Sequence, residues 1–150
     1  ATAYPFLKKG AKIIWADIGI KTRVVTPQTI EQCITEKTKA IVVVHLYGYC
    51  ADMPEIMELA KKNNLLVIED TAQALGAKIG NKSAGSFGDF GIFSFHSHKN
   101  ITTLGEGGML VVKDSKVADI IPMLRHNGHC SFDFDRENYW IPAMGNLDFP

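Results

Sequence analysis

The chain has 150 residues, of which 46% are hydrophobic and 21% are charged, as expected of a globular domain that can bury a core. Sixteen basic residues balance sixteen acidic ones, so the formal net charge is zero, which argues against nucleic acid or an anionic membrane surface as a partner. No apolar run reaches the ~20 residues of a membrane-spanning helix.

The cysteines are few and widely spaced. Cys33, Cys50 and Cys130 are odd in number, which favours reduced thiols over a disulfide framework. We therefore expect a cytoplasmic protein.

Apolar and amphipathic segments alternate along the chain. Residues 12–16 (KIIWA) predict a short buried strand, and Pro27 precedes a short helix expected over residues 29–34. Residues 40–45 (AIVVVH) are a continuous β-branched run, which predicts a strand covered on both faces. Asp52 is placed to cap the next helix, with Pro54 early in it and a buried stripe formed by Ile56, Leu59 and Ala60.

The same alternation continues in the second half. Strands are expected over residues 65–68, 90–95 and 108–112. Asp114 is placed to cap a helix whose apolar side carries Val117, Ile120, Ile121 and Leu124. This order predicts an α/β layer fold with a mainly parallel sheet, and residues 126–150, which have no clear period, are expected to be loop.

Ligands of such sheets bind beyond the carboxyl ends of the strands, and the polar residues His45, Asp70 and 94–99 fall there. Asp70 follows a buried strand within Glu69-Asp70-Thr71-Ala72-Gln73. Taken alone, it could either cap the following turn or face a bound cationic group.

A second polar cluster, Ser94-Phe95-His96-Ser97-His98-Lys99-Asn100, follows another expected strand. A lone lysine in such a loop is usually solvated. Gly105-Glu106-Gly107-Gly108 comes next. Its spacing does not match a dinucleotide or P-loop fingerprint, so we interpret it as a tight turn.

Together, the three clusters suit a pyridoxal-phosphate (PLP) site. A lysine amine can form a Schiff base with the cofactor aldehyde. An aspartate beside the pyridine nitrogen keeps that nitrogen protonated, so that the ring accepts electrons. Hydroxyl and backbone donors can hold the phosphate.

Residues 39–126 resemble the DegT/DnrJ/StrS-type family of sugar-nucleotide aminotransferases. The matching pieces occur in the same order and spacing: His45-Leu46-Tyr47-Gly48, Asp52-Met53, Val67-Ile68-Glu69-Asp70-Thr71-Ala72-Gln73-Ala74, Gly85-Ser86-Phe87-Gly88-Asp89, Phe93-Ser94-Phe95-His96, and Lys99-Asn100 followed by Gly105-Glu106-Gly107-Gly108. The resemblance implies the large domain of fold-type I PLP enzymes.

The family's roles carry over where the residues match. Lys99 would bind the cofactor covalently and move the proton between substrate carbon and cofactor. Asp70 would pair with the pyridine nitrogen, Gln73 would lie against the ring near its phenolic oxygen, and Ser94 would contact the phosphate. No metal is implied, because His126, His129 and Cys130 lack a second pair of ligands. His96 and His98 are interpreted as forming local hydrogen bonds.

The implied reaction takes an amino group from glutamate and gives it to a nucleotide-linked keto-deoxysugar, for a surface polysaccharide or glycan. Two alternatives stay open: an aminotransferase of this family acting on a cyclitol or another ketone, and a non-catalytic ligand-binding paralogue. Relatives with histidine in place of the lysine perform dehydration, and Lys99 argues against that chemistry here.

The resemblance also bears on the extent of the chain. Residues 1–126 match part of the PLP-binding large domain, and residues 127–150 would be a loop-rich segment leading towards the C-terminal part. The family implies a chain more than twice this long that works as a homodimer. An aromatic residue stacked on the cofactor and a phosphate-binding helix would precede Ala1, so we expect the isolated fragment to be inactive.

Overall fold

The computed structural model describes residues 1–126. The chain divides into two compact units, Ala1–Val111 and Val112–Pro150, and each is considered by itself. The helices before residue 112 are α1 (Tyr4–Lys8), α2 (Pro27–Glu31) and α3 (Met53–Lys62). The strands are β1 (Ala40–Val44), β2 (Leu66–Asp70), β3 (Lys78–Ile79), β4 (Lys82–Ser83), β5 (Phe90–Ser94) and β6 (Gly108–Val112).

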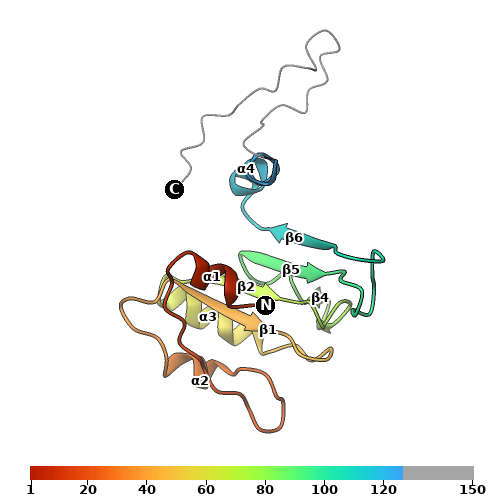
Figure 1. Cartoon of the computed structure of the whole chain (residues 1–150). Coiled ribbons are helices and arrows are strands. Elements are labelled where there is room, and N and C mark those ends of the chain that lie inside the picture. Colours follow the sequence, from red (N-terminus) through yellow and green to blue (C-terminus); the bar gives the residue numbers. More distant parts are fainter. Residues whose placement is uncertain (127–150) are drawn as a thin grey trace. The chain divides into compact units, whose positions relative to one another are not determined.

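The main sheet has the strand order β1-β2-β5-β6, and β3 and β4 form a separate antiparallel pair (Figure 1). β1 pairs in parallel with β2 so that Val44 lies opposite Asp70, and β5 continues the parallel sheet with Ile92 opposite Asp70. In Figure 1 the arrow of β6 points the other way, so this strand runs antiparallel to β5. The predicted mainly parallel α/β sheet is confirmed, and the carboxyl ends of β1, β2 and β5 meet at one edge.

Helix α3 packs its apolar stripe against the sheet. Asp52 caps its first turn by accepting the N–H of Glu55 at 3.3 Å, as predicted. Most residues of the main core come from α3 and from the inward side of β1 and β2: Met53, Ile56, Leu59, Ala60, Ile41, Val43 and Val67. Helix α2 adds Ile30, and loops add Val24, Ala51 and Phe87. A stripe of this kind is typical of a helix lying on one face of a sheet.

Two predictions about the first half of the chain are wrong. β1 is not covered on both faces: Ile41 and Val43 are buried, but Val44 is 36% exposed. Among the described helices, α3 and, through Ile30, α2 supply this core, while α1 buries none of its own residues. Residues 12–16 form no strand, and Trp15 is 76% exposed. A strand needs a partner for its backbone groups, and the nearest pairing is a single bridge between Ile18 and Val25.

The helix expected over residues 29–34 is present but begins earlier, at Pro27. Thr26 is its N-cap and exchanges hydrogen bonds with Thr29. This reciprocal cap fixes the start of the helix two residues ahead of the prediction.

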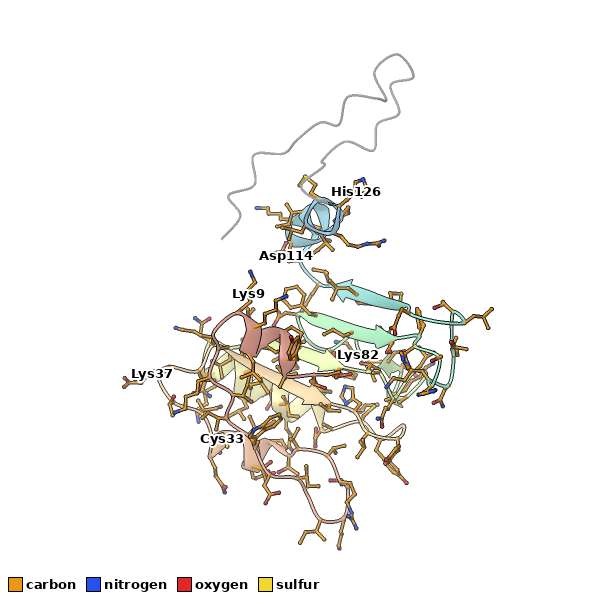
Figure 2. The ribbon with its side chains drawn as sticks, viewed as in Figure 1. Lys9, Cys33, Lys37, Lys82, Asp114 and His126 are labelled. Atoms are coloured by element: carbon orange, nitrogen blue, oxygen red, sulfur yellow. The ribbon has the colours of Figure 1, made fainter. Side chains whose placement is uncertain are left out.

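In the second unit the structure describes helix α4 (Ser115–Arg125), whose start is labelled at Asp114 in Figure 2. Asp114 caps it as predicted, accepting the N–H of Lys116 at 2.8 Å. The loop expected over residues 126–150 lies outside the described residues beyond His126, and the expected division at residue 126 stays a prediction. Within residues 1–126, no helix has both the length and the apolar character needed to cross a membrane.

The glycine at position 91 is a strict steric requirement of β5. A Cβ there would collide with the carbonyl oxygen of Gly85, a backbone atom that cannot move aside easily. We expect Gly91→Ala in the full-length protein to lower the free energy of unfolding by about 1–3 kcal/mol, measured by urea unfolding. Gly105→Ala is the matched control, because nothing lies within 4 Å of its added Cβ. Equal stability of the two variants would contradict the tight approach of residues 85 and 91.

Candidate active site

The sheet gathers the predicted site residues at the edge where its parallel strands end. Asp70 is the last residue of β2 and lies opposite Ile92 of β5. Ser94 is the last residue of β5, and the loop that follows carries Lys99. Because β2 and β5 are hydrogen-bonded neighbours running in the same direction, Asp70, Ser94 and the Lys99 loop are brought to the same edge.

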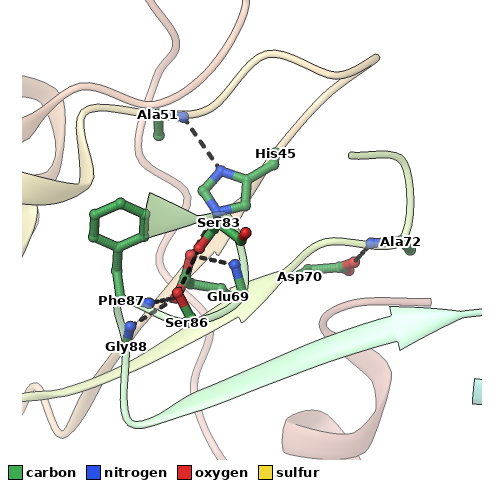
Figure 3. A network of polar contacts seen from close by, with 10 residues as sticks. His45, Ala51, Glu69, Asp70, Ala72, Ser83, Ser86, Phe87 and Gly88 are labelled. Atoms are coloured by element: carbon green, nitrogen blue, oxygen red, sulfur yellow. Dashed lines mark hydrogen bonds and ion pairs between the residues drawn. The ribbon is translucent and has the colours of Figure 1, made fainter. Parts of the chain in front are cut away.

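The carboxylate of Asp70 is half-buried and is held through both oxygens. Oδ1 accepts the N–H of Ala72 at 3.1 Å (Figure 3), which is the turn-capping contact considered from the sequence. Oδ2 accepts the hydroxyl of Thr2 at 2.6 Å. Capping therefore uses one oxygen only, and the second is engaged by a residue 68 positions away in sequence.

The loop from Ser94 to Lys99 is organised by local hydrogen bonds. The Oγ of Ser94 accepts the N–H of His96 at 3.4 Å, and Nδ1 of His96 accepts the N–H of His98 at 3.2 Å. The backbone N–H of Lys99 donates to the carbonyl of His96 at 2.9 Å. Nε2 of His96 lies 3.5 Å from Glu106 Oε1. The interpretation as a local hydrogen-bonding residue is confirmed for the side chain of His96, whereas His98 contributes its backbone N–H.

The half-buried side chain of Lys99 forms no ion pair with any carboxylate among residues 1–126. Gln73 is exposed, and its backbone carbonyl accepts the N–H of Gly48 at 3.0 Å. This contact ties the turn that follows β1 to the turn that follows β2. The roles expected of Lys99, Gln73, Ser94 and Asp70 toward a cofactor stay predictions.

The most extensive polar network is centred on Glu69, a residue that received no role in the sequence analysis. Glu69 is fully buried, and its carboxylate accepts four hydrogen bonds (Figure 3). Nε2 of His45 donates at 2.9 Å and the N–H of Gly85 at 2.8 Å to Oε2. The N–H groups of Phe87 and Gly88 donate to Oε1, both at 2.6 Å.

The protonation of His45 follows from its second nitrogen. The backbone N–H of Ala51 donates to Nδ1 at 3.2 Å, so Nδ1 carries no proton. The imidazole is therefore neutral, with its proton on Nε2 directed at Glu69. His45, which is also fully buried, links the loop after β1 to β2.

The electrostatics of Glu69 favour the ionised form. Burial by itself would raise the pKa of its carboxyl, but the hydrogen bonds from His45 and from the N–H groups of Gly88 and Gly85 outweigh burial and lower the pKa. The nearby Cys50 responds in the opposite sense: burial, and then the charge of Glu69, raise the pKa of its thiol. Cys50 is therefore a protonated thiol at neutral pH.

One signal in the sequence could have identified Glu69. Alternate residues of a strand point to the same face, so Glu69 shares a face with Val67, which is fully buried. An acid on a buried face needs hydrogen-bond donors, and the glycine turn Gly85-Ser86-Phe87-Gly88 offers free backbone N–H groups. Asp70, one residue later, points to the other face.

A surface pocket of about 540 Å³ is lined by residues from the segment before α2 and from the loop before α3, Cys50 and Asp52 among them. Its lining contains none of Asp70, Gln73, Ser94 or Lys99. The possible metal ligands His129 and Cys130 lie outside the described residues.

Comparison with known proteins connects this arrangement to one family. The sequence model of the DegT/DnrJ/EryC1/StrS aminotransferase family matches residues 1–146. The chain is 52% identical over 136 residues to GDP-perosamine synthase of Escherichia coli O157:H7, covering 91% of this chain and 36% of that protein. It is 48% identical over 128 residues to UDP-N-acetyl-3-dehydro-alpha-D-glucosamine 3-aminotransferase of Acidithiobacillus ferrooxidans, covering 85% and 35%. The chain thus spans about a third of the length of these relatives.

Solved structures agree on the fold. PseC of Helicobacter pylori, an aminotransferase involved in the biosynthesis of pseudoaminic acid, superposes with a TM-score of 0.86 at 32% identity, over 97% of this chain and 38% of that one. E. coli GDP-4-keto-6-deoxy-D-mannose-3-dehydratase with bound hydrated PLP gives a TM-score of 0.77 at 32% identity, over 83% and 32%. Structural similarity thus extends to both aminotransferases and a dehydratase.

Replacing Glu69 by glutamine tests the buried network. Glutamine keeps the size of the side chain, but its NH₂ group cannot accept from the backbone donors of residues 85–88. We expect Glu69→Gln to lower the free energy of unfolding by about 1–3 kcal/mol at neutral pH. The lowered pKa of Glu69 stabilises the folded wild-type protein at pH values above 4.5, the ordinary pKa of the carboxyl. This stabilisation is lost as the pH falls through the pKa of Glu69 in the folded state. The difference in free energy of unfolding between wild type and Glu69→Gln should therefore shrink below pH 4.5.

Urea unfolding of the full-length protein at neutral and acidic pH measures both effects. Glu58→Gln, an exposed glutamate on α3, is the matched control and should follow the wild type throughout. A Glu69→Gln variant as stable as wild type at neutral pH would show that the four donors contribute nothing.

Proposed function

Because this chain belongs to the DegT/DnrJ/EryC1/StrS aminotransferase family, we propose that the full-length protein is a PLP-dependent aminotransferase. Its reaction moves an amino group from glutamate to a nucleotide-linked keto-deoxysugar. One observation carries the proposal: the carboxylate of Asp70 and the loop of Lys99 follow the carboxyl ends of two adjacent parallel strands, β2 and β5.

The chemistry of these residues fits PLP. The two oxygens of Asp70 accept one hydrogen bond each from Thr2 and Ala72, which leaves lone pairs for a protonated ring nitrogen. The Oγ of Ser94 accepts from a backbone N–H, so its own proton is available for a phosphate oxygen. When bound, PLP supplies an electron sink for a carbanion at the substrate carbon.

Each residue then has a distinct task. Lys99 would hold the cofactor through its amine, and the same amine could take and return the proton at the substrate carbon. Asp70 would hold the proton on the ring nitrogen, Ser94 would donate to the phosphate, and Gln73 would lie against the ring. The absence of an ion pair to Lys99 among residues 1–126 leaves its amine free for these roles.

Relatives support a sugar-nucleotide substrate. Two of them are named for GDP-perosamine synthesis and for 3-amination of a UDP-linked dehydro-glucosamine, and we propose the same substrate class here, for a surface polysaccharide or glycan. A cyclitol or other ketone is the alternative substrate within the family. A non-catalytic paralogue would not need Lys99, Asp70, Gln73 and Ser94 together, so these residues favour an enzyme.

Dehydration is the second candidate reaction, because the E. coli dehydratase shares the fold. Lys99 favours amination, since an amine can both bind the cofactor and transfer the proton.

We further propose that the enzyme acts in the cytoplasm, which suits the free thiols of Cys33 and Cys50. We propose a second copy as its partner, and exposed apolar side chains such as Trp15 and Leu104 are consistent with further burial.

The proposal is tested by incubating full-length protein with PLP, glutamate and a panel of nucleotide keto-sugars and cyclitol ketones. Mass spectrometry of the products separates the candidates. An amino sugar formed together with 2-oxoglutarate supports amination. A deoxysugar without retained nitrogen indicates dehydration, and unchanged substrates across the panel, including cyclitol ketones, would favour the non-catalytic paralogue.

Lys99→Ala should abolish transamination and the visible absorbance of covalently bound cofactor, because the variant has no amine at this position. Activity assays and absorbance spectra of the full-length variant measure both. Lys37→Ala, at an exposed lysine before β1, is the control and should behave as wild type. Turnover at the wild-type rate in Lys99→Ala would rule out the assignment.

Asp70→Ala should reduce the rate by several orders of magnitude, through loss of the charge that keeps the ring nitrogen protonated. Asp52→Ala is the matched control, because it also removes a carboxylate that accepts a backbone N–H, in this case at the cap of helix α3. Steady-state kinetics of the two variants separate chemistry from capping. A fall of less than about tenfold in Asp70→Ala, ~1.4 kcal/mol of barrier, would show that Asp70 does not face the ring nitrogen.

A further inference from the structure

The hydroxyl of Thr2 lies 2.6 Å from Oδ2 of Asp70. Thr2 precedes helix α1 and is half-buried, whereas Asp70 ends strand β2. The two residues are 68 positions apart, so the contact depends on the folded chain and is not a local turn. A separation this short is typical of a hydroxyl donating to an ionised carboxylate.

The direction of this hydrogen bond follows from the groups involved. An ionised carboxylate only accepts, so the threonine hydroxyl is the donor. Ala72 occupies Oδ1 with its backbone N–H, and this donor cannot be removed by changing a side chain. Thr2 therefore supplies the one side-chain hydrogen bond that the structure gives to Asp70 within residues 1–126.

Two donors on different oxygens resist rotation of a carboxylate about its Cβ–Cγ bond. With only the Ala72 contact, the Asp70 carboxylate could turn while keeping one hydrogen bond. The Thr2 contact ties the second oxygen to the segment before α1. The carboxylate plane is then set by two different parts of the chain, which is the kind of support that keeps a functional group in a productive orientation.

We propose that Thr2 is a positioning residue that orients the Asp70 carboxylate toward the ring nitrogen of the cofactor. This inference rests on the proposed PLP-dependent function. Thr2 does not touch the reacting atoms and acts only through Asp70. Its methyl group is dispensable for this role, whereas its hydroxyl is required.

The test compares Thr2→Val, which keeps the shape and removes the donor, with Thr2→Ser, which keeps the donor. Full-length variants are loaded with PLP labelled with ¹⁵N in the ring, and the ¹⁵N chemical shift reports protonation of the ring nitrogen. We expect Thr2→Val to move this shift toward the unprotonated value and to lower kcat about tenfold. Thr2→Ser should restore both.

Thr35→Val is the matched control, because it makes the same substitution at an exposed threonine before β1, whose hydroxyl oxygen accepts the N–H of Lys37 at 3.3 Å. It should leave the ¹⁵N shift unchanged. An unchanged shift in Thr2→Val, or a shift in Thr2→Ser as large as that in Thr2→Val, would overturn the proposal.

The outcomes also separate this inference from the proposed function. Wild-type protein that does not bind PLP would contradict the function itself. Wild-type protein that binds PLP and transaminates, together with a Thr2→Val variant that has the wild-type shift, would contradict only the role of Thr2. If Thr2→Val fails to fold, Thr2→Ala and Thr2→Ser carry the same comparison of donor lost against donor kept.

Discussion

The buried carboxylate of Glu69 is the interaction on which the rest of the site edge depends. It joins three segments that are far apart in sequence: β2 itself, the glycine turn of residues 85–88, and His45, which directly follows β1. A buried charge is tolerated only when hydrogen bonds replace its lost hydration, and four donors do so here. The network thereby fixes where β2 ends and where the chain turns into β5.

Adjacent acids of β2 have divided roles because a strand alternates its faces. Glu69 points into the protein and holds the scaffold, whereas Asp70 points the other way and keeps lone pairs for a ligand. Further backbone bonds join the three strands at this level: the N–H of His45 donates to the carbonyl of Asp70, and the N–H of Thr71 donates to the carbonyl of Ile92. The orientation of Asp70 thus rests on a rigid strand end, and the proposed function uses that rigidity.

Helix starts and strands could be predicted from the sequence where local signals agree with the fold. Asp52 and Asp114 marked helix starts through their capping oxygens, and the strands leading to Asp70 and Ser94 were identified by apolar runs. Features that depend on contacts between distant segments could not be predicted from the sequence. Residues 12–16 have the composition of a strand but pair with no other strand within residues 1–126. The contacts of Glu69 and of Thr2 join distant segments, and no local pattern specifies such contacts directly.

We propose that Lys99 is the residue that binds the cofactor. Borohydride reduction of full-length protein incubated with PLP, followed by proteolysis and mass spectrometry, tests it most directly, since reduction makes the attachment permanent at whichever lysine formed it. We expect a pyridoxyl-phosphate label on Lys99. A label confined to another lysine, or no label on protein shown to be folded, would contradict it.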